Sequence, residues 1–298
     1  MCDHGCVSLQ RSPRRYGPDD LVLNHFTLAR QHPLRDRFAA AAAAGFAGVG
    51  LYVGEYLRLC REGFDIEQLA DLLDEFELGL ADIEVVRVWP EDDGTVAAMA
   101  TFEATAWQLA DRFDCRYLQA IGPTLGGPVA EVAAPFAALC DRAADHGLLV
   151  GLEFLPFTDI VTAADALAIV EAADRPNGGI CLDIWHHARG ANDMAMVAAI
   201  PAERVMAVQM NDGPLTPDLD SYYEECLRRR LPPGDGEMDA AGFVASLLAR
   251  GVALPWSIEV CNDAVWDQPA GPHVLACGNG MRAVLTAARA RLAPDPLY

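Results

Sequence analysis

Three carboxylates and one amide lie near the ends of short apolar segments in the second half of the chain. Glu153 lies in GLEFLPF, Asp183 in CLDIWHH, Gln209 in VQMND and Glu259 in SIEVCND. One such residue alone would be read as a solvated side chain at the end of a strand. Four in succession, each beside apolar residues that should bury it, suggest a shared role. Converging buried carboxylates repel one another and cost several kcal/mol unless a cation or protons neutralise them.

These residue types favour a metal ion bound by oxygen atoms. Hard, octahedral cations such as Mg²⁺ and Mn²⁺ prefer carboxylate and carbonyl oxygens, whereas zinc prefers nitrogen or sulfur. We therefore expect one divalent metal ion, Mn²⁺ or Mg²⁺, and the predicted ligands are Glu153, Asp183, Gln209 and Glu259. Coordination positions would remain open for substrate oxygens.

Other polar residues are candidates for binding the substrate or supporting the ligands. Glu84 and His25 lie in predicted strands and would point to the same end of the fold, so both are candidate substrate-binding residues. His187 is interpreted as a neighbour of a functional His186 rather than as a catalytic residue. Asn211 and Asp212 follow Gln209 and either support the metal ligands or serve as polar loop residues; the sequence leaves both interpretations open.

Side chains from distant segments can converge only if the strands that carry them end at the same edge of one sheet. Apolar runs separated by helical patterns indicate parallel strands buried on both faces. The predicted strands cover 21–28, 48–53, 80–89, 117–122, 148–157, 179–185, 205–212 and 255–260. The predicted helices cover 34–45, 65–78, 95–113, 128–146, 162–173, 193–200, 239–250 and 276–291.

Eight such repeats predict an α/β fold, namely a single (β/α)₈ TIM barrel with eight parallel strands. We expect an N-terminal extension over 1–20 and the catalytic barrel over 21–298. Neither a dinucleotide-binding motif nor a phosphate-binding loop motif follows the first strand, which disfavours an open nucleotide-binding sheet. The irregular stretch 213–238 follows the seventh strand, and barrel enzymes place their active sites in loops of this kind.

Composition excludes several classes of partner. The 298 residues carry 43 acidic and 22 basic side chains and a formal charge of −21, which opposes binding to nucleic acid. Nine cysteines without a CxxC pair suggest reduced thiols and a cytoplasmic location. The segment CDHGC at 2–6 is interpreted as a frayed terminus. No apolar run is long enough for a membrane span, so no membrane partner is expected.

Several segments together resemble the xylose isomerase-like TIM barrel superfamily, in particular its sugar phosphate isomerase/epimerase family, which has an AP endonuclease family 2 type barrel. These segments are GLEF, DIWHHARG, RVMAVQMNDGP, RRLPPGDGEMD and LPWSIEVCND, and the resemblance extends from about residue 21 to 290. It implies that Glu153, Asp183 and Glu259 bind one divalent metal ion. It also implies that His186, three positions after Asp183, touches the substrate.

Two further positions refine what the resemblance implies. The fourth metal ligand in this family is commonly histidine, where this chain has Gln209, and some relatives with glutamine there resemble 3-dehydroshikimate dehydratases. The stretch from Arg230 to Gly236 matches the family pattern Arg-x-x-Pro-Gly-x-Gly. Arg230 is then placed to meet an anionic or polar group of the substrate.

This ligand set predicts an isomerase or epimerase of a keto-sugar, cyclitol or related hydroxyketone that works through a metal-stabilised enediolate. Glu153 and Glu259 would exchange a proton on opposite faces of the substrate. If His186 instead protonates a leaving hydroxyl, the same site becomes a lyase like 3-dehydroshikimate dehydratase. Endonuclease action on abasic DNA conflicts with the charge, and a non-catalytic barrel conflicts with four intact ligands. Members of the family that this chain resembles are often dimers or tetramers, so the resemblance is compatible with a homodimer or a homotetramer.

Overall fold

The computed structural model describes residues 16–28, 31–89, 93–122 and 129–293. Eight parallel strands pair in chain order, and the last pairs with the first to close a barrel. The strands are β1 (Leu21–Leu23), β2 (Gly48–Tyr52), β3 (Gly79–Arg87), β4 (Tyr117–Ile121), β5 (Leu149–Glu153), β6 (Gly178–Asp183), β7 (Val205–Met210) and β8 (Trp256–Ile258). The predicted (β/α)₈ barrel is therefore confirmed.

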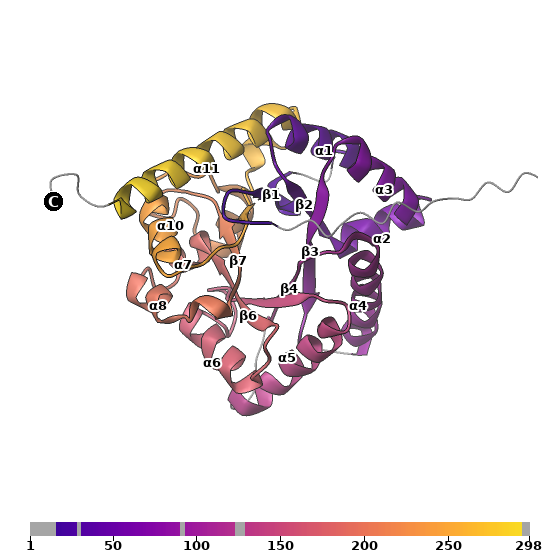
Figure 1. The fold of residues 1–298 in the computed structure, drawn as a ribbon, viewed down its shortest axis with the longest axis horizontal. Helices are drawn as coiled ribbons and strands as arrows, with labels where there is room; N and C mark the ends of the chain where they lie inside the picture. The colour runs from indigo at the N-terminus through magenta and orange to yellow at the C-terminus, as the bar shows by residue number, and fades with distance from the viewer. Residues whose placement is uncertain (1–15, 29–30, 90–92, 123–128, 294–298) are drawn as a thin grey trace, which may run out of the picture.

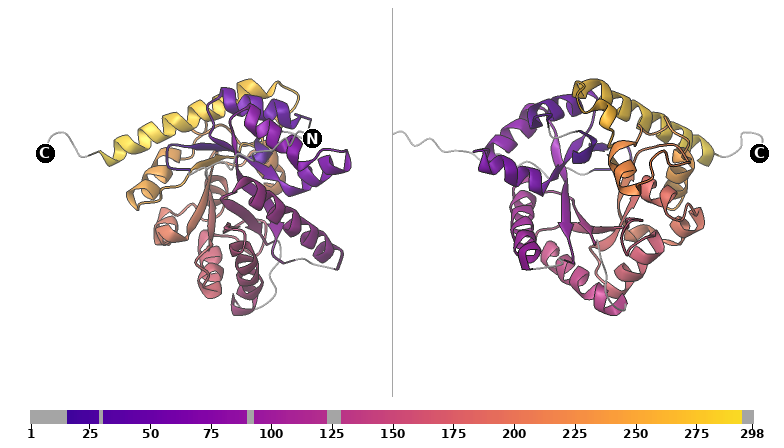
Figure 2. Two further views of the ribbon diagram at one scale, coloured as in Figure 1. Left: turned by 45° about the vertical axis from the view of Figure 1, so that its right-hand side comes forward. Right: turned by 180° about the vertical axis from the view of Figure 1, so that it is seen from behind.

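Helices form a ring around the strands, as Figures 1 and 2 show from three directions. They are α1 (Leu34–Ala43), α2 (Val53–Arg61), α3 (Ile66–Glu75), α4 (Asp93–Phe113), α5 (Val129–Ala144), α6 (Ala163–Ala173), α7 (Ile184–Arg189), α8 (Met194–Ala199), α9 (Tyr222–Arg228), α10 (Ala240–Ala249) and α11 (Ala270–Leu292). The last helix, α11, packs between α1 and α10 and joins the two ends of the ring. No helix among the described residues is both long and apolar enough to cross a bilayer.

Burial explains why these segments form strands. The apolar side chains of the strands are almost entirely inaccessible to solvent, with Val22, Leu152 and Val208 at 0% exposure. Both faces of each strand are covered, by the helices outside and by the opposite strands inside. Because all strands are parallel, their carboxyl ends lie at the same end of the barrel, and polar side chains at those ends face one another.

Two predicted strands extend at least four residues beyond the end of the observed strand. The run 21–28 was expected to be extended throughout, but β1 ends at Leu23, because the Asn24 side chain accepts a hydrogen bond from Phe26 N at 2.9 Å and turns the chain. The run 148–157 was also too long, since β5 ends at Glu153. His25 therefore lies in a short 3₁₀ turn (His25–Thr27) beyond the first strand rather than within it.

Three helices were not predicted from the sequence. Helix α2 follows β2 directly, and α9 lies inside the stretch 213–238 that was interpreted as irregular. Helix α7 begins where the sixth strand was expected to continue. Its first turn is capped by the Asp183 carboxylate, which accepts a hydrogen bond from Trp185 N at 2.8 Å. His186 therefore lies on a helix beside the strand ends.

A buried ion pair fixes α9 against α7. Arg189 Nε lies 3.0 Å from Glu225 Oε2, and their side chains are 3% and 0% exposed. The Arg189 guanidinium also stacks on the Trp185 ring, at 4.4 Å from its centroid. The stretch 213–238 is thereby attached to the rim of the barrel. The segment CDHGC at 2–6 lies outside the described residues.

Candidate metal and substrate site

The predicted ligands come together at one end of the barrel. Glu153 and Asp183 are the last residues of β5 and β6, and Glu259 directly follows β8. Gln209 pairs in register with Asp183 in the neighbouring strand β7. All four residues are buried, with at most 6% exposure. We refer to Glu153, Asp183 and Glu259 as the carboxylate cluster.

His186 stands between two members of the carboxylate cluster. Its Nε2 atom lies 3.5 Å from Glu153 Oε1 and 3.5 Å from Asp183 Oδ2. The three residues each offer one ligand atom, and these atoms lie within 4.8 Å of one another. Such a buried set of carboxylate oxygens and an imidazole nitrogen fits the donor preferences of a divalent metal ion.

Arg230 connects the third member, Glu259, to this group. Its Nη1 atom donates to Asp183 Oδ2 and to Glu259 Oε2, each at 2.7 Å. Nη2 lies 3.4 Å from His186 Nε2, and Nε donates to Cys226 O at 2.9 Å. The guanidinium is 2% exposed, so its charge is held close to the carboxylates with little screening by water. A residue expected to meet the substrate thus also bridges two predicted metal ligands.

Gln209 lies beside Asp183, and the oxygen of its side-chain amide accepts a hydrogen bond. Oε1 accepts a hydrogen bond from the Cys181 thiol at 3.3 Å, and the side chain is 2% exposed. Its place beside Asp183 matches the prediction of a fourth residue at these strand ends. The role of Gln209 as a ligand remains a proposal.

The structure separates the two interpretations of the residues after β7. Asn211 Nδ2 donates to Asp183 Oδ1 at 2.9 Å, so Asn211 supports a predicted ligand. Asp212 instead accepts hydrogen bonds from backbone amides of the loop, including Gly234 N at 2.9 Å. One residue therefore orients the site and the other organises the loop.

Sequence reasoning missed Gln119, which lies in β4. Its Nε2 donates to Glu153 Oε2 at 2.8 Å, while its Oε1 is buried without a hydrogen-bond partner among the described residues. Gln119 is a polar residue inside the apolar run YLQAI, which is the same signal that identified the carboxylates. The donated hydrogen bond orients the Glu153 carboxylate and favours its ionised form.

Tyr222, the first residue of α9, contacts His186 directly. Its hydroxyl lies 2.6 Å from His186 Nδ1, and the two ring centroids are 6.1 Å apart. A hydrogen bond to one ring nitrogen decides which tautomer a neutral histidine adopts. Tyr222 thus leaves Nε2 facing the carboxylates.

Burial and mutual repulsion shift the acidities of the carboxylate cluster. Burial, followed by the charges of Glu259 and Asp183, raises the pKa of Glu153 well above its ordinary value. Burial is also the main reason that the pKa of Glu259 is raised to about 7, against the opposing charge of Arg230. Burial acts in the same direction on Asp183, but Arg230, His186 and Asn211 outweigh it, so its pKa is lowered.

The imidazole of His186 is neutral at pH 7. Burial lowers its pKa to about 3, although the charge of Asp183 opposes the shift. A neutral imidazole keeps a lone pair on one nitrogen. Because the Arg230 guanidinium has only donors to offer, its approach to Nε2 favours the lone pair at that atom.

Glu84, His25 and His187 are the remaining polar residues that the sequence indicates near the strand ends. Glu84 lies in β3 and is 1% exposed; its Oε1 accepts from His25 N at 3.3 Å. Its pKa is raised well above the ordinary value by burial and then by the charge of Glu259. Glu84 and His25 are thus adjacent. His187 is buried, and its ring centroid lies 5.8 Å from that of Phe243 in α10.

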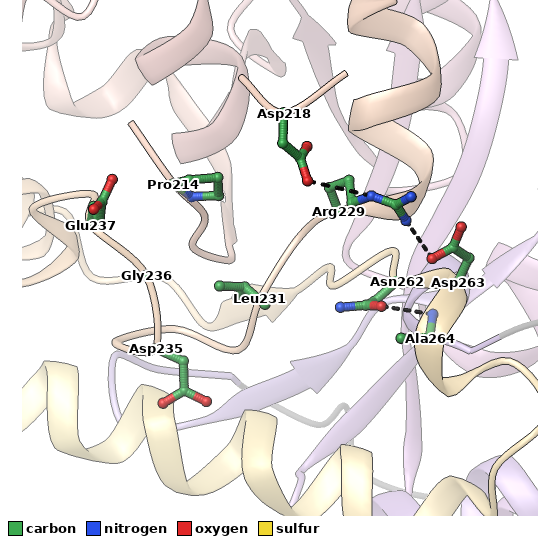
Figure 3. Close-up of a pocket in the computed structure, with 10 residues that line it drawn as sticks. All are labelled: Pro214, Asp218, Arg229, Leu231, Asp235, Gly236, Glu237, Asn262, Asp263 and Ala264. Carbon is green, nitrogen blue, oxygen red and sulfur yellow. Dashed lines mark hydrogen bonds and ion pairs between the residues drawn. The ribbon is translucent and has the colours of Figure 1, made fainter. Parts of the chain in front are cut away.

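A separate pocket of about 550 Å³ lies between the stretch 213–238 and residues 262–264, which follow β8 (Figure 3). Arg229, a neighbour of Arg230 in sequence, lies there between Asp218 and Asp263. None of the predicted site residues lines this pocket. It is therefore distinct from the convergence of the strand ends.

Two curated proteins are similar to this chain over most of its length. The 3-dehydroshikimate dehydratases of Pseudomonas aeruginosa and Pseudomonas putida are 29% and 28% identical to it over 271 residues. Each alignment covers 87% of this chain but only 40% of the relative. The chain thus spans less than half the length of the curated relatives it matches.

Solved structures share the fold at lower identity. The IOLI protein with a binding zinc atom has a TM-score of 0.78 and 18% identity, covering 90% of this chain and 98% of that one. A D-allulose 3-epimerase from Methylomonas sp. has a TM-score of 0.68 and 20% identity, covering 89% and 98%. The family model described as xylose isomerase-like TIM barrel matches residues 38–277. The closed barrel and this match show that the chain belongs to the xylose isomerase-like TIM barrel family.

Proposed function

We propose that the chain is a divalent-metal-dependent hydro-lyase that removes water from a cyclic hydroxyketone acid such as 3-dehydroshikimate. The observation that carries this proposal is the carboxylate cluster, buried together with a neutral His186 and the guanidinium of Arg230. Two 3-dehydroshikimate dehydratases among the relatives favour this reaction class. Because each relative is more than twice as long as the matched region, activity of this barrel alone is part of the proposal.

Glu153, Asp183, Gln209 and Glu259 would hold the metal ion, for which we propose Mn²⁺ or Mg²⁺. When bound, such an ion polarises the ketone of the substrate and makes the neighbouring C–H bond more acidic. The chain contains no lysine, since all 22 basic residues are arginine. A lysine Schiff base is therefore not available to activate the ketone, which supports a metal-assisted route.

The residues of the chain can supply the proton transfers of a dehydration. Ionised Glu153 removes the proton from the carbon beside the ketone, and its raised pKa makes it a stronger base than an ordinary carboxylate. Protonated Glu153 then delivers this proton to the leaving hydroxyl, which departs as water, while neutral His186, with Nε2 3.5 Å from Glu153 Oε1, orients the hydroxyl by a hydrogen bond. To pair with the carboxylate of the substrate, Arg230 would exchange hydrogen bonds that it makes to Asp183 and Glu259.

A second candidate is the isomerase or epimerase reaction expected from the sequence. It is favoured by the positions of Glu153 at the end of β5 and Glu259 directly after β8, because these strands are not neighbours in the barrel. Two carboxylates from different sides of the ring could remove a proton on one face of a keto-sugar and return it on the other. Glu84 and His25 are proposed to bind substrate hydroxyl groups in either reaction.

One assay distinguishes the two reactions. Protein reconstituted separately with Mn²⁺, Mg²⁺ or Zn²⁺ is incubated with 3-dehydroshikimate, and the ultraviolet absorption of an aromatic product is followed. Formation of this product supports the lyase. Incorporation of solvent deuterium into keto-sugars without loss of water, together with no change in 3-dehydroshikimate, would instead establish the isomerase.

Metal binding is expected to release protons and to strengthen as the pH rises. A metal ion requires ionised ligands, whereas Glu259, with a pKa of about 7, is largely protonated at pH 5. Calorimetry in buffers with different ionisation enthalpies should show proton release near pH 6.5, and affinity should increase through pH 7. Affinity that is constant between pH 5 and 8 would contradict the assignment of Glu259 as a ligand.

The same pKa shift predicts how the stability of the metal-free protein depends on pH. The folded-state pKa of Glu259 lies above its ordinary value of 4.5, so the folded protein binds more protons between these two values. Its contribution to stability is therefore fully present below pH 4.5 and is lost as the pH rises through about 7. Denaturant unfolding with a chelator present would measure this contribution as the difference between wild type and Glu259→Gln.

Replacing Tyr222 by Phe is expected to lower kcat about 10- to 100-fold, the range typical for residues that orient a functional histidine. The change removes the hydroxyl group 2.6 Å from His186 Nδ1 and retains the ring. Tyr223→Phe is a matched control, because that side chain is 53% exposed and packs against Phe157. Equal activity of both variants would show that the hydroxyl of Tyr222 does not orient His186.

A further inference from the structure

Asp212 is buried at the start of the loop that follows β7, and its carboxylate is surrounded by backbone amides. Oδ1 accepts from Gly213 N at 2.8 Å and from Met238 N at 3.0 Å, and Oδ2 accepts from Gly234 N at 2.9 Å. The residue is 1% exposed. The loop 231–238 thus closes around a carboxylate of the chain itself. We refer to these three amides as the amide cradle.

The glycines of the Arg-x-x-Pro-Gly-x-Gly stretch allow this closure. A Cβ atom on Gly236 would lie 2.3 Å from Asp212 Oδ1 and 2.4 Å from Gly213 N, so a larger residue does not fit. Gly234 has a φ of +89°, a conformation that other residues rarely adopt. Since the amide cradle is filled by Asp212, this glycine-rich loop is not available as a binding site for an external anion.

Asp212 is also coupled to Arg230 through the backbone. Asp212 and Leu231 exchange two hydrogen bonds, of 2.9 Å and 2.8 Å, and Leu231 directly follows Arg230. Arg230 N donates to Cys261 O, and Arg230 O accepts from Asn262 Nδ2, both at 3.0 Å. The main chain of Arg230 is therefore held between the segments that follow β7 and β8, with its guanidinium directed at the carboxylate cluster.

We propose that Asp212 is a positioning residue that acts through Arg230. Its carboxylate holds the returning loop, and the loop holds the Arg230 backbone at the distance from which Nη1 reaches Asp183 and Glu259. The effect on turnover rests on the proposed function, whereas the effect on the loop does not. Asp212 is not proposed to contact either metal or substrate.

The first test is Asp212→Asn, which retains the size of the side chain. Asparagine has one acceptor oxygen, so its NH₂ group must face an amide donor of the amide cradle. We expect kcat/KM to fall about 100-fold, as for a small misplacement of a functional group, and the metal affinity to stay unchanged. Asp235→Asn is the matched control, because this exposed carboxylate in the same loop extends toward α11 (Figure 3). An equal loss in both variants would overturn the proposal.

A double-mutant cycle tests whether the effect passes through Arg230. In an Arg230→Gln background, Asp212→Asn should cause little further loss of kcat/KM, because coupled residues are not additive. Additive losses would overturn the proposal. If Asp212→Asn does not fold, Gly234→Ala is a second substitution in the same loop, since it strains the backbone there while its Cβ has ordinary contact distances.

Hydrogen exchange tests the proposal without any substrate. In Asp212→Asn, faster exchange is expected at Gly234 and Met238 and also at Arg230 and Leu231; Asp235→Asn should resemble the wild type. Exchange at Arg230 that stays as slow as in the wild type, while the amide cradle opens, would overturn the positioning role. An inactive wild-type protein would count against the proposed function alone, because the exchange result remains interpretable.

Discussion

Replacing Glu153 by Gln is expected to reduce turnover by about 10²- to 10⁴-fold, the range for a lost general base, while the fold stays intact. Gln is nearly isosteric and can still accept the hydrogen bond from Gln119 Nε2. It cannot ionise, so both the proposed proton abstraction and the negative charge offered to a metal ion are lost. This prediction is the most direct test of the site.

The same substitution should not destabilise the protein when metal is absent. Glu153 is buried beside Glu259 and Asp183, whose charges raise its pKa, so neutralising it removes repulsion. Denaturant unfolding with a chelator present should therefore give wild-type or higher stability. Glu171→Gln in α6 is the control for the chemical change, because that side chain is exposed. Full activity of Glu153→Gln would exclude Glu153 from the catalytic machinery.

Replacing Arg230 by Met is expected to lower stability by about 3–5 kcal/mol, as when one partner of a buried ion pair is removed. Its guanidinium is 2% exposed and its Nη1 bridges Asp183 and Glu259. Without it these two carboxylates lose their shared hydrogen-bond donor and its positive charge. Methionine fills much of the volume, so the loss would reflect charge and hydrogen bonding rather than a cavity.

Arg229→Met is the matched control for this prediction. Arg229 is the preceding residue and pairs with Asp218 and Asp263, but its side chain is 33% exposed. Because solvent screens such pairs, its loss should cost less than about 1 kcal/mol. Unfolding by urea would measure both variants. Similar losses for both would show that the charge of Arg230 is not essential to the carboxylate cluster.

The Arg230 substitution should also impair binding of an acidic substrate. If the guanidinium pairs with a substrate carboxylate, KM for 3-dehydroshikimate should rise in Arg230→Met even when the reaction is followed at a temperature where the variant is folded. A neutral keto-sugar should be less affected. Equal effects on acidic and neutral substrates would indicate that Arg230 acts on the carboxylate cluster alone.

The order and number of the barrel strands could be predicted from the sequence because each strand is apolar and buried on both faces. The same pattern identified the carboxylate cluster, since a polar residue near the end of an apolar run is conspicuous. The sequence pattern therefore predicts the positions of Glu153, Asp183 and Glu259 without any knowledge of their contacts. Gln119 carries the same signal and could have been found in this way.

Contacts with the loops and short helices were decided only by the tertiary structure. Tyr222 and His186 are 36 residues apart, and Arg230 and Asp183 are 47 apart, so no local pattern joins them. Their meeting depends on barrel closure and on the docking of α9 against α7 through Arg189 and Glu225. The sequence pattern within the stretch 213–238 does not indicate a helix or a strand. The ion pair between Arg189 and Glu225 and the hydrogen bonds to the Asp212 carboxylate determine the path of this stretch instead. The sequence by itself determined which groups lie at the strand ends, and the tertiary structure decided which groups orient and neutralise them.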